Sequence, residues 1–146
     1  MNDSITELAS SWVSVSLYIH GLHLDPTATT ATLGVQPTEA RMAGESRILS
    51  SGRKIIQKNG LWVFRIRKEN GDIESMVDEL SSIFAENAAT IEELSGLEEA
   101  YLDIFVSYSP SDKRDSKFEA KLSRESIKTI ALMNLPVQFT CAVTMT

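Results

Sequence analysis

Three segments of the chain alternate apolar and polar residues with a period of two. In Trp12–Ile19 every second residue is Val, Leu or Ile, and the residues between them are Ser or Tyr. Tyr101–Ser109 and Val137–Met145 follow the same pattern. This alternation is typical of strands with one buried face. We therefore expect three strands here, with Cys141 filling the core from the last of them.

Other segments carry the spacing of amphipathic helices. The clearest is Ile73–Phe84, with apolar residues at i, i+3 and i+4 and Asp72 as the N-cap. Asp25-Pro26 predicts the start of a short helix that ends before Gly34. Thr90-Ile91-Glu92-Glu93 resembles a capping box and predicts a helix that ends near Gly96.

The last predicted helix begins after Ser123 and runs through Met133. We expect Ile127, Ile130 and Ala131 to form its buried side.

A hairpin is predicted at Lys58-Asn59-Gly60, because Asn-Gly suits a type I′ turn. The flanking strands would be Lys54–Gln57 and Leu61–Arg67, preceded by a loop at residues 38–52. In the second strand Trp62, Phe64 and Ile66 share one face, and Val63, Arg65 and Arg67 share the other. We expect the aromatic face in the core and the basic face in water, although exposed aromatic rings could instead stack on bases.

These elements predict a single α+β domain at residues 11–146 after a flexible N-terminus at residues 1–10. The expected architecture is a four- to five-stranded, mainly antiparallel sheet with helices on one face. The order of elements suggests two βαβ-like halves, a variant of the ferredoxin-like plan.

Charge is segregated along the chain. The formal net charge of the 146 residues is −6, yet Arg41–Lys68 holds eight basic residues and one acid. Glu69–Asp103 holds eleven carboxylates and no Lys or Arg. Such a single-sign segment can steer an oppositely charged partner.

Most catalytic and cofactor classes find no support in the sequence. The paired carboxylates lack any sign of environments that would separate their pKa values, and there is no phosphate loop or nucleophile elbow. His20 and His23 are the two histidines, with Gly21 between them, so we expect no metal site. We expect a non-enzymatic cytoplasmic protein without cofactor, signal peptide or membrane span.

Binding is therefore the predicted role, and the charge pattern offers two surfaces for it. Either surface could instead be a solvated face, with the acidic and basic segments neutralising each other within the fold. The acidic candidates, for a basic protein partner, are Asp72, Glu74, Asp78, Glu79, Glu86, Glu92 and Glu93. The alternative is a nucleic-acid or nucleotide-binding patch, although the negative net charge of the chain disfavours binding to nucleic acid. This patch comprises Arg53, Lys54, Lys58, Arg65 and Arg67.

Several features, taken in order along residues 11–145, resemble a bacterial family known as domain of unknown function 4279. They include the strand Val13–Ile19, Asp25-Pro26, the turn Leu33-Gly34-Val35 before Pro37, the strand Leu61–Phe64 and the helix Ile73–Phe84. These motifs are structural, and the family brings no catalytic residues to this chain.

The resemblance also implies a partner. Domains of this kind look like small cytosolic proteins found beside bacterial polymorphic or contact-dependent toxins. It implies an immunity protein that binds and neutralises a cognate toxin domain. Many such toxin domains are nucleases with basic grooves, which an acidic surface would fit.

Overall fold

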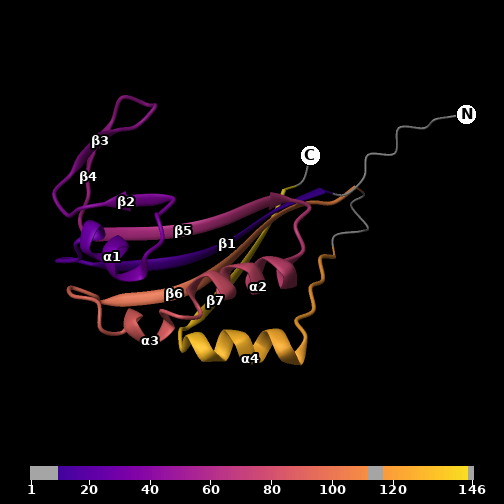
Figure 1. Ribbon diagram of the computed structural model, residues 1–146. Helices are drawn as coiled ribbons and strands as arrows, with labels where there is room; N and C mark the ends of the chain where they lie inside the picture. Colours follow the sequence, from indigo (N-terminus) through magenta and orange to yellow (C-terminus); the bar gives the residue numbers. More distant parts are fainter. Residues whose placement is uncertain (1–9, 112–116, 145–146) are drawn as a thin grey trace, which may run out of the picture.

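The alternating segments form the centre and one edge of a five-stranded sheet (Figure 1). The computed structural model describes residues 10–111 and 117–144. Of the expected flexible N-terminus at residues 1–10, residues 1–9 lie outside the described residues, and Ser10 belongs to the first strand. The strands of this sheet are β1 (Ser10–Gly21), β2 (Glu39–Arg41), β5 (Gly60–Glu69), β6 (Glu99–Ser109) and β7 (Val137–Val143).

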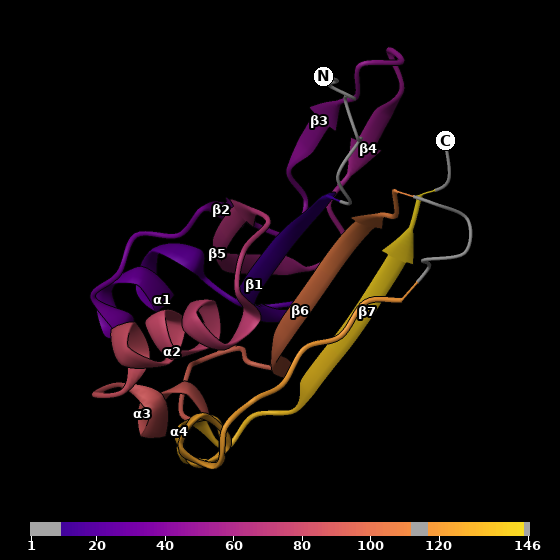
Figure 2. The ribbon, with the colours of Figure 1, turned by 90° about the vertical axis from the view of Figure 1, so that its right-hand side faces the viewer.

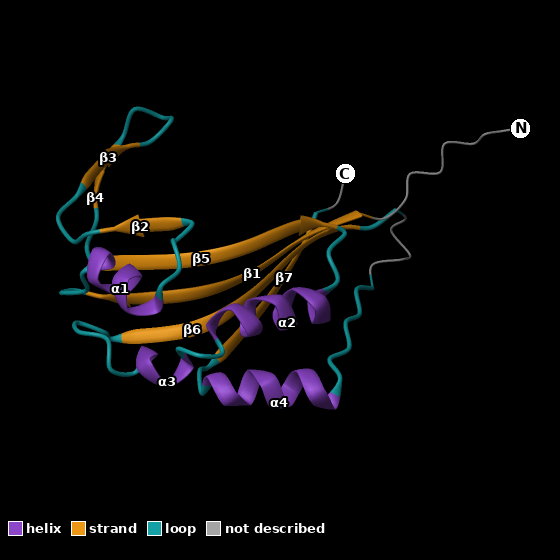
Figure 3. Ribbon diagram, viewed as in Figure 1, coloured by secondary structure: helices purple, strands orange, loops and turns teal. Residues whose placement is uncertain are grey.

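The sheet is mixed. Its order is β2-β5-β1-β6-β7, with antiparallel pairing throughout except between β6 and β7. The helices in the described part of the chain all lie on one face, as Figures 2 and 3 show. They are α1 (Pro26–Leu33), α2 (Ile73–Phe84), α3 (Ala88–Ile91) and α4 (Arg124–Met133).

The α+β class and the one-sided helical layer are thus confirmed, whereas the ferredoxin-like detail is not. The strands β6 and β7 are parallel and α4 connects them, which makes one βαβ unit. In the first half, α1 follows β1, and β5 comes only after β2, β3 and β4; β1 and β5 are antiparallel neighbours. The structure therefore contains one such unit where two βαβ-like halves were expected.

The core lies between the central strands and the helices. The apolar residues of β1 at positions 13, 15, 17 and 19 are fully buried, as the alternation predicts. Trp62 of β5 is also fully buried and donates a hydrogen bond from Nε1 to Thr30 Oγ1 of α1 at 3.0 Å. Its ring lies edge-on to Phe84 of α2. The expected core face of β5 is therefore confirmed at Trp62, whereas Phe64 and Ile66 are only partly buried against the core. Val63, on the face expected in water, is fully buried.

Three of the predicted helix starts are confirmed by their caps. Asp25 accepts hydrogen bonds from the amides of Thr27 and Ala28, and Asp72 accepts one from the Ser75 amide. Ser123 caps α4. These side chains satisfy amide groups that the first helical turn leaves without partners.

The capping box at Thr90 is wrong. The helix α3 begins at Ala88, with Asn87 as its N-cap, so Thr90 lies inside the helix. The Thr90 hydroxyl donates to the Asn87 carbonyl at 2.7 Å. The Glu93 amide, which a capping box would place on this hydroxyl, instead donates to the Thr90 backbone carbonyl at 3.1 Å.

The Asn59-Gly60 hairpin is also wrong. The segment β4 (Lys54–Ile56) pairs with β3 (Ser46–Ile48), inside the expected loop, and forms a separate ribbon that projects from the sheet (Figure 3). Neither Asn59 nor Gly60 has the positive φ that a type I′ turn requires. The strand β5 instead pairs with β1 along ten residues, and this long pairing outweighs the local turn signal.

The expected buried side of α4 is only partly correct. Ile130 is buried, but Ile127 is 51% exposed and Ala131 is exposed as well. The helix packs against α2 through Ser126, whose single hydroxyl proton is shared between two carboxylates of that helix, Glu74 and Asp78. This polar contact turns Ile127 toward solvent.

One end of the sheet is closed by a junction of glycines from three segments. A Cβ atom on Gly21, at the end of β1, would lie 1.9 Å from the carbonyl oxygen of Gly96. A Cβ atom on Gly60, at the start of β5, would lie 2.5 Å from the Leu24 carbonyl oxygen. The three backbones approach so closely that only glycine fits.

Among the described residues, no helix has the length and apolar content to cross a membrane.

Candidate functional site

The helix-free face of the sheet contains a depression of about 380 Å³. Ser14 and Ser16 of β1 point to this face, and the neighbouring strands place longer side chains on either side of each serine. The short serines leave space in the middle of the sheet that the longer neighbours enclose. The lining residues are Ser14, Tyr18, Arg65, Arg67, Asp103 and Phe105.

Arg65 is held in place by neutral partners. Its Nε donates to Ser16 Oγ at 3.2 Å and its Nη2 donates to Tyr18 Oη at 2.7 Å. No carboxylate in the described ranges forms an ion pair with it. The partly buried guanidinium is therefore oriented by hydroxyl groups, with the Asp103 carboxylate as a nearby counter-charge that forms no ion pair with it. Its remaining N–H donors are available to a ligand.

Aromatic rings surround the same depression. Tyr18 and Tyr101 are directly opposite each other in the register and stack with ring centroids 5.3 Å apart. At the other end, the Arg67 guanidinium lies 4.2 Å from the centre of the Trp12 ring, a cation–π contact. Trp12 remains 41% exposed.

Two ionisable groups on this face are perturbed by burial. Burial raises the pKa of Asp103, while the charge of Arg65 acts in the opposite direction. Burial, followed by the neighbouring Tyr18, raises the pKa of Tyr101. Next to this pair His20 contacts Glu99 through Nε2 at 3.0 Å. The face is thus mixed in charge.

The predicted basic patch is divided between two places. Arg65 and Arg67 line the depression, whereas Lys54 lies in the projecting ribbon of β3 and β4. Arg53 precedes β4 and Lys58 follows it. The structure therefore brings together two of the five residues and separates the others.

Most of the predicted acidic residues have structural partners in the fold. Asp72 caps α2, and Glu79 forms an ion pair with Lys68 at 3.4 Å. Glu92 accepts a hydrogen bond from Asn134 at 2.6 Å. Glu86 and Glu93 are exposed on the helical layer. One ion pair, Lys68–Glu79, joins the acidic and basic segments within the described residues.

The two remaining acids fix α4 on α2. Glu74 accepts hydrogen bonds from the Ser123 amide and the Ser126 hydroxyl, both at 2.8 Å, and Asp78 accepts from the same hydroxyl at 2.8 Å. Hydrogen bonds from Ser123, then from Ser126, hold the pKa of Glu74 below its usual value. The positive charge of Lys121 acts in the same direction, so the folded state favours the ionised form of Glu74.

This arrangement predicts a pH-dependent stability. Because the pKa of Glu74 is lowered by folding, its contribution is present above the unfolded pKa and is lost as the pH falls through the folded pKa. We expect Glu74→Gln to lower the melting temperature at pH 7. The difference from wild type should shrink as the solution is acidified below the folded pKa, as measured by thermal unfolding followed by circular dichroism.

A matched control for this prediction is Glu93→Gln, on the same helical layer but without a hydrogen bond to α4 among the described residues. Its melting temperature should match that of the wild type at every pH. A Glu74→Gln difference that persisted unchanged into acid would contradict the assignment of Glu74 as a charged acceptor.

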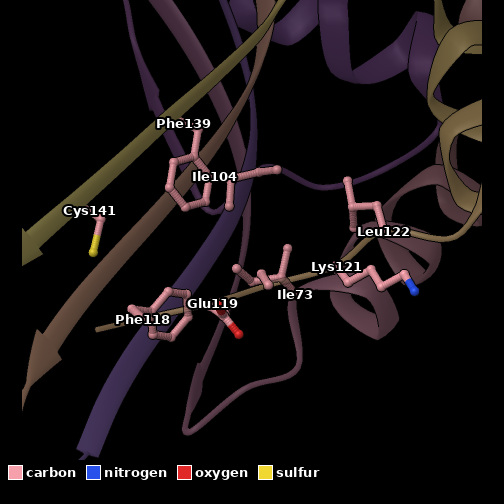
Figure 4. Close-up of a pocket in the computed structure, with 9 residues that line it drawn as sticks. Ile73, Ile104, Phe118, Glu119, Lys121, Leu122, Phe139 and Cys141 are labelled. Carbon is pink, nitrogen blue, oxygen red and sulfur yellow. The ribbon is translucent and has the colours of Figure 1, made fainter. Parts of the chain in front are cut away.

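A larger apolar groove, of about 850 Å³, lies along β7 on the helical side (Figure 4). Ile104 and Phe139 point into it from neighbouring strands, and Phe118 and Leu122 come from the segment before α4. Cys141 also lines it and is exposed, so the prediction of a core thiol is wrong. The strand β7 is at the sheet edge, where α2 and α4 do not cover it.

The described residues contain no cluster of three His, Cys, Asp or Glu side chains that could hold a metal.

The model of one protein family, the domain of unknown function DUF4279, matches residues 10–144. The chain belongs to this family. No curated protein and no solved structure matches it significantly. The matched range contains every residue that the structure describes, so the fold and both surfaces lie within the DUF4279 domain of this chain.

The site residues that sequence reasoning missed in this DUF4279 domain are on the helix-free face. Trp12, Tyr18, Tyr101 and Asp103 were not among the candidates, although their strands were predicted. The alternation assigns Tyr18 to the polar face of β1, and the same argument assigns Arg65 to the polar face of β5. Knowing that β5 and β1 are neighbours would have joined them into one site.

Proposed function

We propose that this DUF4279 domain acts by binding rather than by catalysis, and that its partner is a basic protein domain. In this proposal it is an immunity protein, which neutralises a toxin domain, such as a nuclease, in the cytoplasm. The docking surface is the outer side of α2 and α3 with the residues that follow them.

The supporting observation is the way in which the acidic side chains of this surface are held. Serine and asparagine donors orient Glu74, Asp78 and Glu92, and these donors carry no charge. Hydrogen bonds of this kind fix carboxylates in position without cancelling their field. Lys121 acts on Glu74 as a nearby positive charge, whereas Asp78 and Glu92 form no ion pair among the described residues. Their ordered negative charge favours rapid encounter with a cationic surface.

The structure also refines which acids are available to a partner. Glu86 and Glu93 are exposed, and neither is used to hold α4 on α2. Replacing Asp78 would disturb the contact with Ser126 and confuse folding with binding. Glu86 and Glu93 are therefore the better residues for a test.

We expect the double variant Glu86→Lys/Glu93→Lys to slow association with the proposed toxin partner by about tenfold or more at low salt. Stopped-flow kinetics over a range of salt concentrations should also show a weaker salt dependence than for the wild type. Glu45→Lys makes the same charge reversal beside the projecting ribbon, away from α2 and α3, and serves as the control. An association rate unchanged in the double variant would remove this surface from the interface.

A growth assay tests the immunity role separately. Co-expression of the wild-type protein should protect bacteria from the toxin domain, and the double variant should protect less at equal expression. If the wild-type protein bound the toxin domain tightly but did not protect the cells, it would be a binding protein without an immunity role.

A further inference from the structure

The depression on the helix-free face has the features of a small-molecule site, independently of the acidic surface. We propose that it binds a small ligand that joins an anionic group to a planar ring, as a nucleoside monophosphate does. Nothing in this proposal depends on the helical layer, which lies on the other face of the sheet (Figure 2).

Two guanidinium groups provide the anion site. Arg65 and Arg67 are two residues apart on β5, so their side chains leave the same face of the strand. A guanidinium has five N–H donors, and Arg65 uses its Nε and Nη2 for hydroxyl groups of β1. Its remaining donors, together with those of Arg67, can bind the oxygens of a phosphate.

The stacked and exposed rings provide the second part of the site. Phe105 is 38% exposed on the β6 side of Ser14, across from Arg67 on β5. Tyr18 closes one end, fixed by its stack on Tyr101 and its hydrogen bond from Arg65. A planar ring placed over Ser14 would contact aromatic surface and bring its polar edge toward Asp103, which can accept a hydrogen bond.

Size and charge favour a small ligand over a polynucleotide. The volume of about 380 Å³ falls within the range of small-molecule pockets. Sites for single-stranded nucleic acid follow the backbone with a continuous basic groove. Here Glu69 and Glu99, on the strands that flank β1, interrupt the basic surface.

The test is isothermal titration calorimetry of the full chain with the four ribonucleoside monophosphates. Inorganic phosphate and the corresponding nucleosides serve as separate arms for the anion and the ring. At least one monophosphate should bind about tenfold or more tightly than phosphate or its nucleoside. It should also quench the fluorescence of Trp12, because Trp62 is fully buried.

Two variants identify the site. Arg67→Gln removes an exposed charge and should weaken binding by about tenfold or more. Ser14→Leu keeps every charge and should abolish binding by filling the depression. Arg124→Gln, on α4, makes the same change as Arg67→Gln in the helical layer and should bind like the wild type.

Any of three results would overturn the proposal. One is the absence of binding by all four monophosphates to a folded wild-type protein. Another is binding that Arg67→Gln and Ser14→Leu leave unchanged while both keep the wild-type melting temperature. Binding of a single-stranded oligonucleotide without any monophosphate binding would likewise reject the small-ligand proposal.

Discussion

Replacing Trp62 with alanine should lower the free energy of unfolding by about 3–5 kcal/mol. The indole is fully buried between β5 and the helices, and its removal leaves a cavity that the surrounding residues cannot fill completely. Thr30 would also lose the indole Nε1 donor at 3.0 Å. Chemical denaturation at constant pH measures this difference.

The matched control for Trp62 is Trp12→Ala on the helix-free face. Trp12 is 41% exposed, so the same substitution there should cost about 1 kcal/mol or less. If Trp62→Ala kept the wild-type stability, Trp62 would not be a core residue. A selective loss of ligand binding in such a variant would make it a contact residue instead.

Gly21→Ala should have a comparably large effect, at least about 3 kcal/mol, because of steric overlap. The added methyl group would lie 1.9 Å from the Gly96 carbonyl oxygen, which is a backbone atom and cannot rotate away. The loop before β6 would have to move, and with it the hydrogen bond from the Glu98 amide to the His20 carbonyl. Denaturant titration of the purified variant provides the measurement.

Gly34→Ala is the control for this prediction. Gly34 has φ of 70° at the end of α1, and a Cβ atom there would meet nothing within 4 Å. Its cost should be limited to the left-handed backbone conformation, about 1–2 kcal/mol. Equal costs for both variants would show that the loop moves away from Gly21 easily, contrary to our account.

Sequence periodicity predicted the interior of the fold because it reports on the residues of one element. The alternation in β1 and the helical spacing in α2 each assign a buried face, and both assignments are confirmed. The caps at Asp25 and Asp72 are equally local, since each carboxylate bonds amides within three residues.

The same reasoning failed where a neighbouring element determines the outcome. Alternation in β7 shows which residues share a face, but not that the strand is at an edge where Phe139 stays 52% exposed. The Asn59-Gly60 turn was overridden by a strand pairing between residues far apart in the sequence. Register and strand order, which local patterns do not contain, set both results.

The functional surfaces show the same difference between what local patterns predict and what long-range pairing determines. Charge counts located the acidic segment, yet they could not show that Ser126 would orient Glu74 and Asp78 together. The basic segment appeared continuous in sequence, but the fold separates Lys54 from Arg65. The depression on the helix-free face exists because the register sets Arg65 against Ser16 of β1 and Ser16 against Asp103 of β6.

The central claim, that the acidic helical layer binds a basic protein domain, is tested most directly by nuclear magnetic resonance. The ¹⁵N-labelled protein would be titrated with the unlabelled toxin domain that the proposal requires as its partner. Our account predicts amide shift changes that concentrate in residues 78–93, with little change along β1. Changes confined to the helix-free face, with α2 and α3 unaffected, would contradict it.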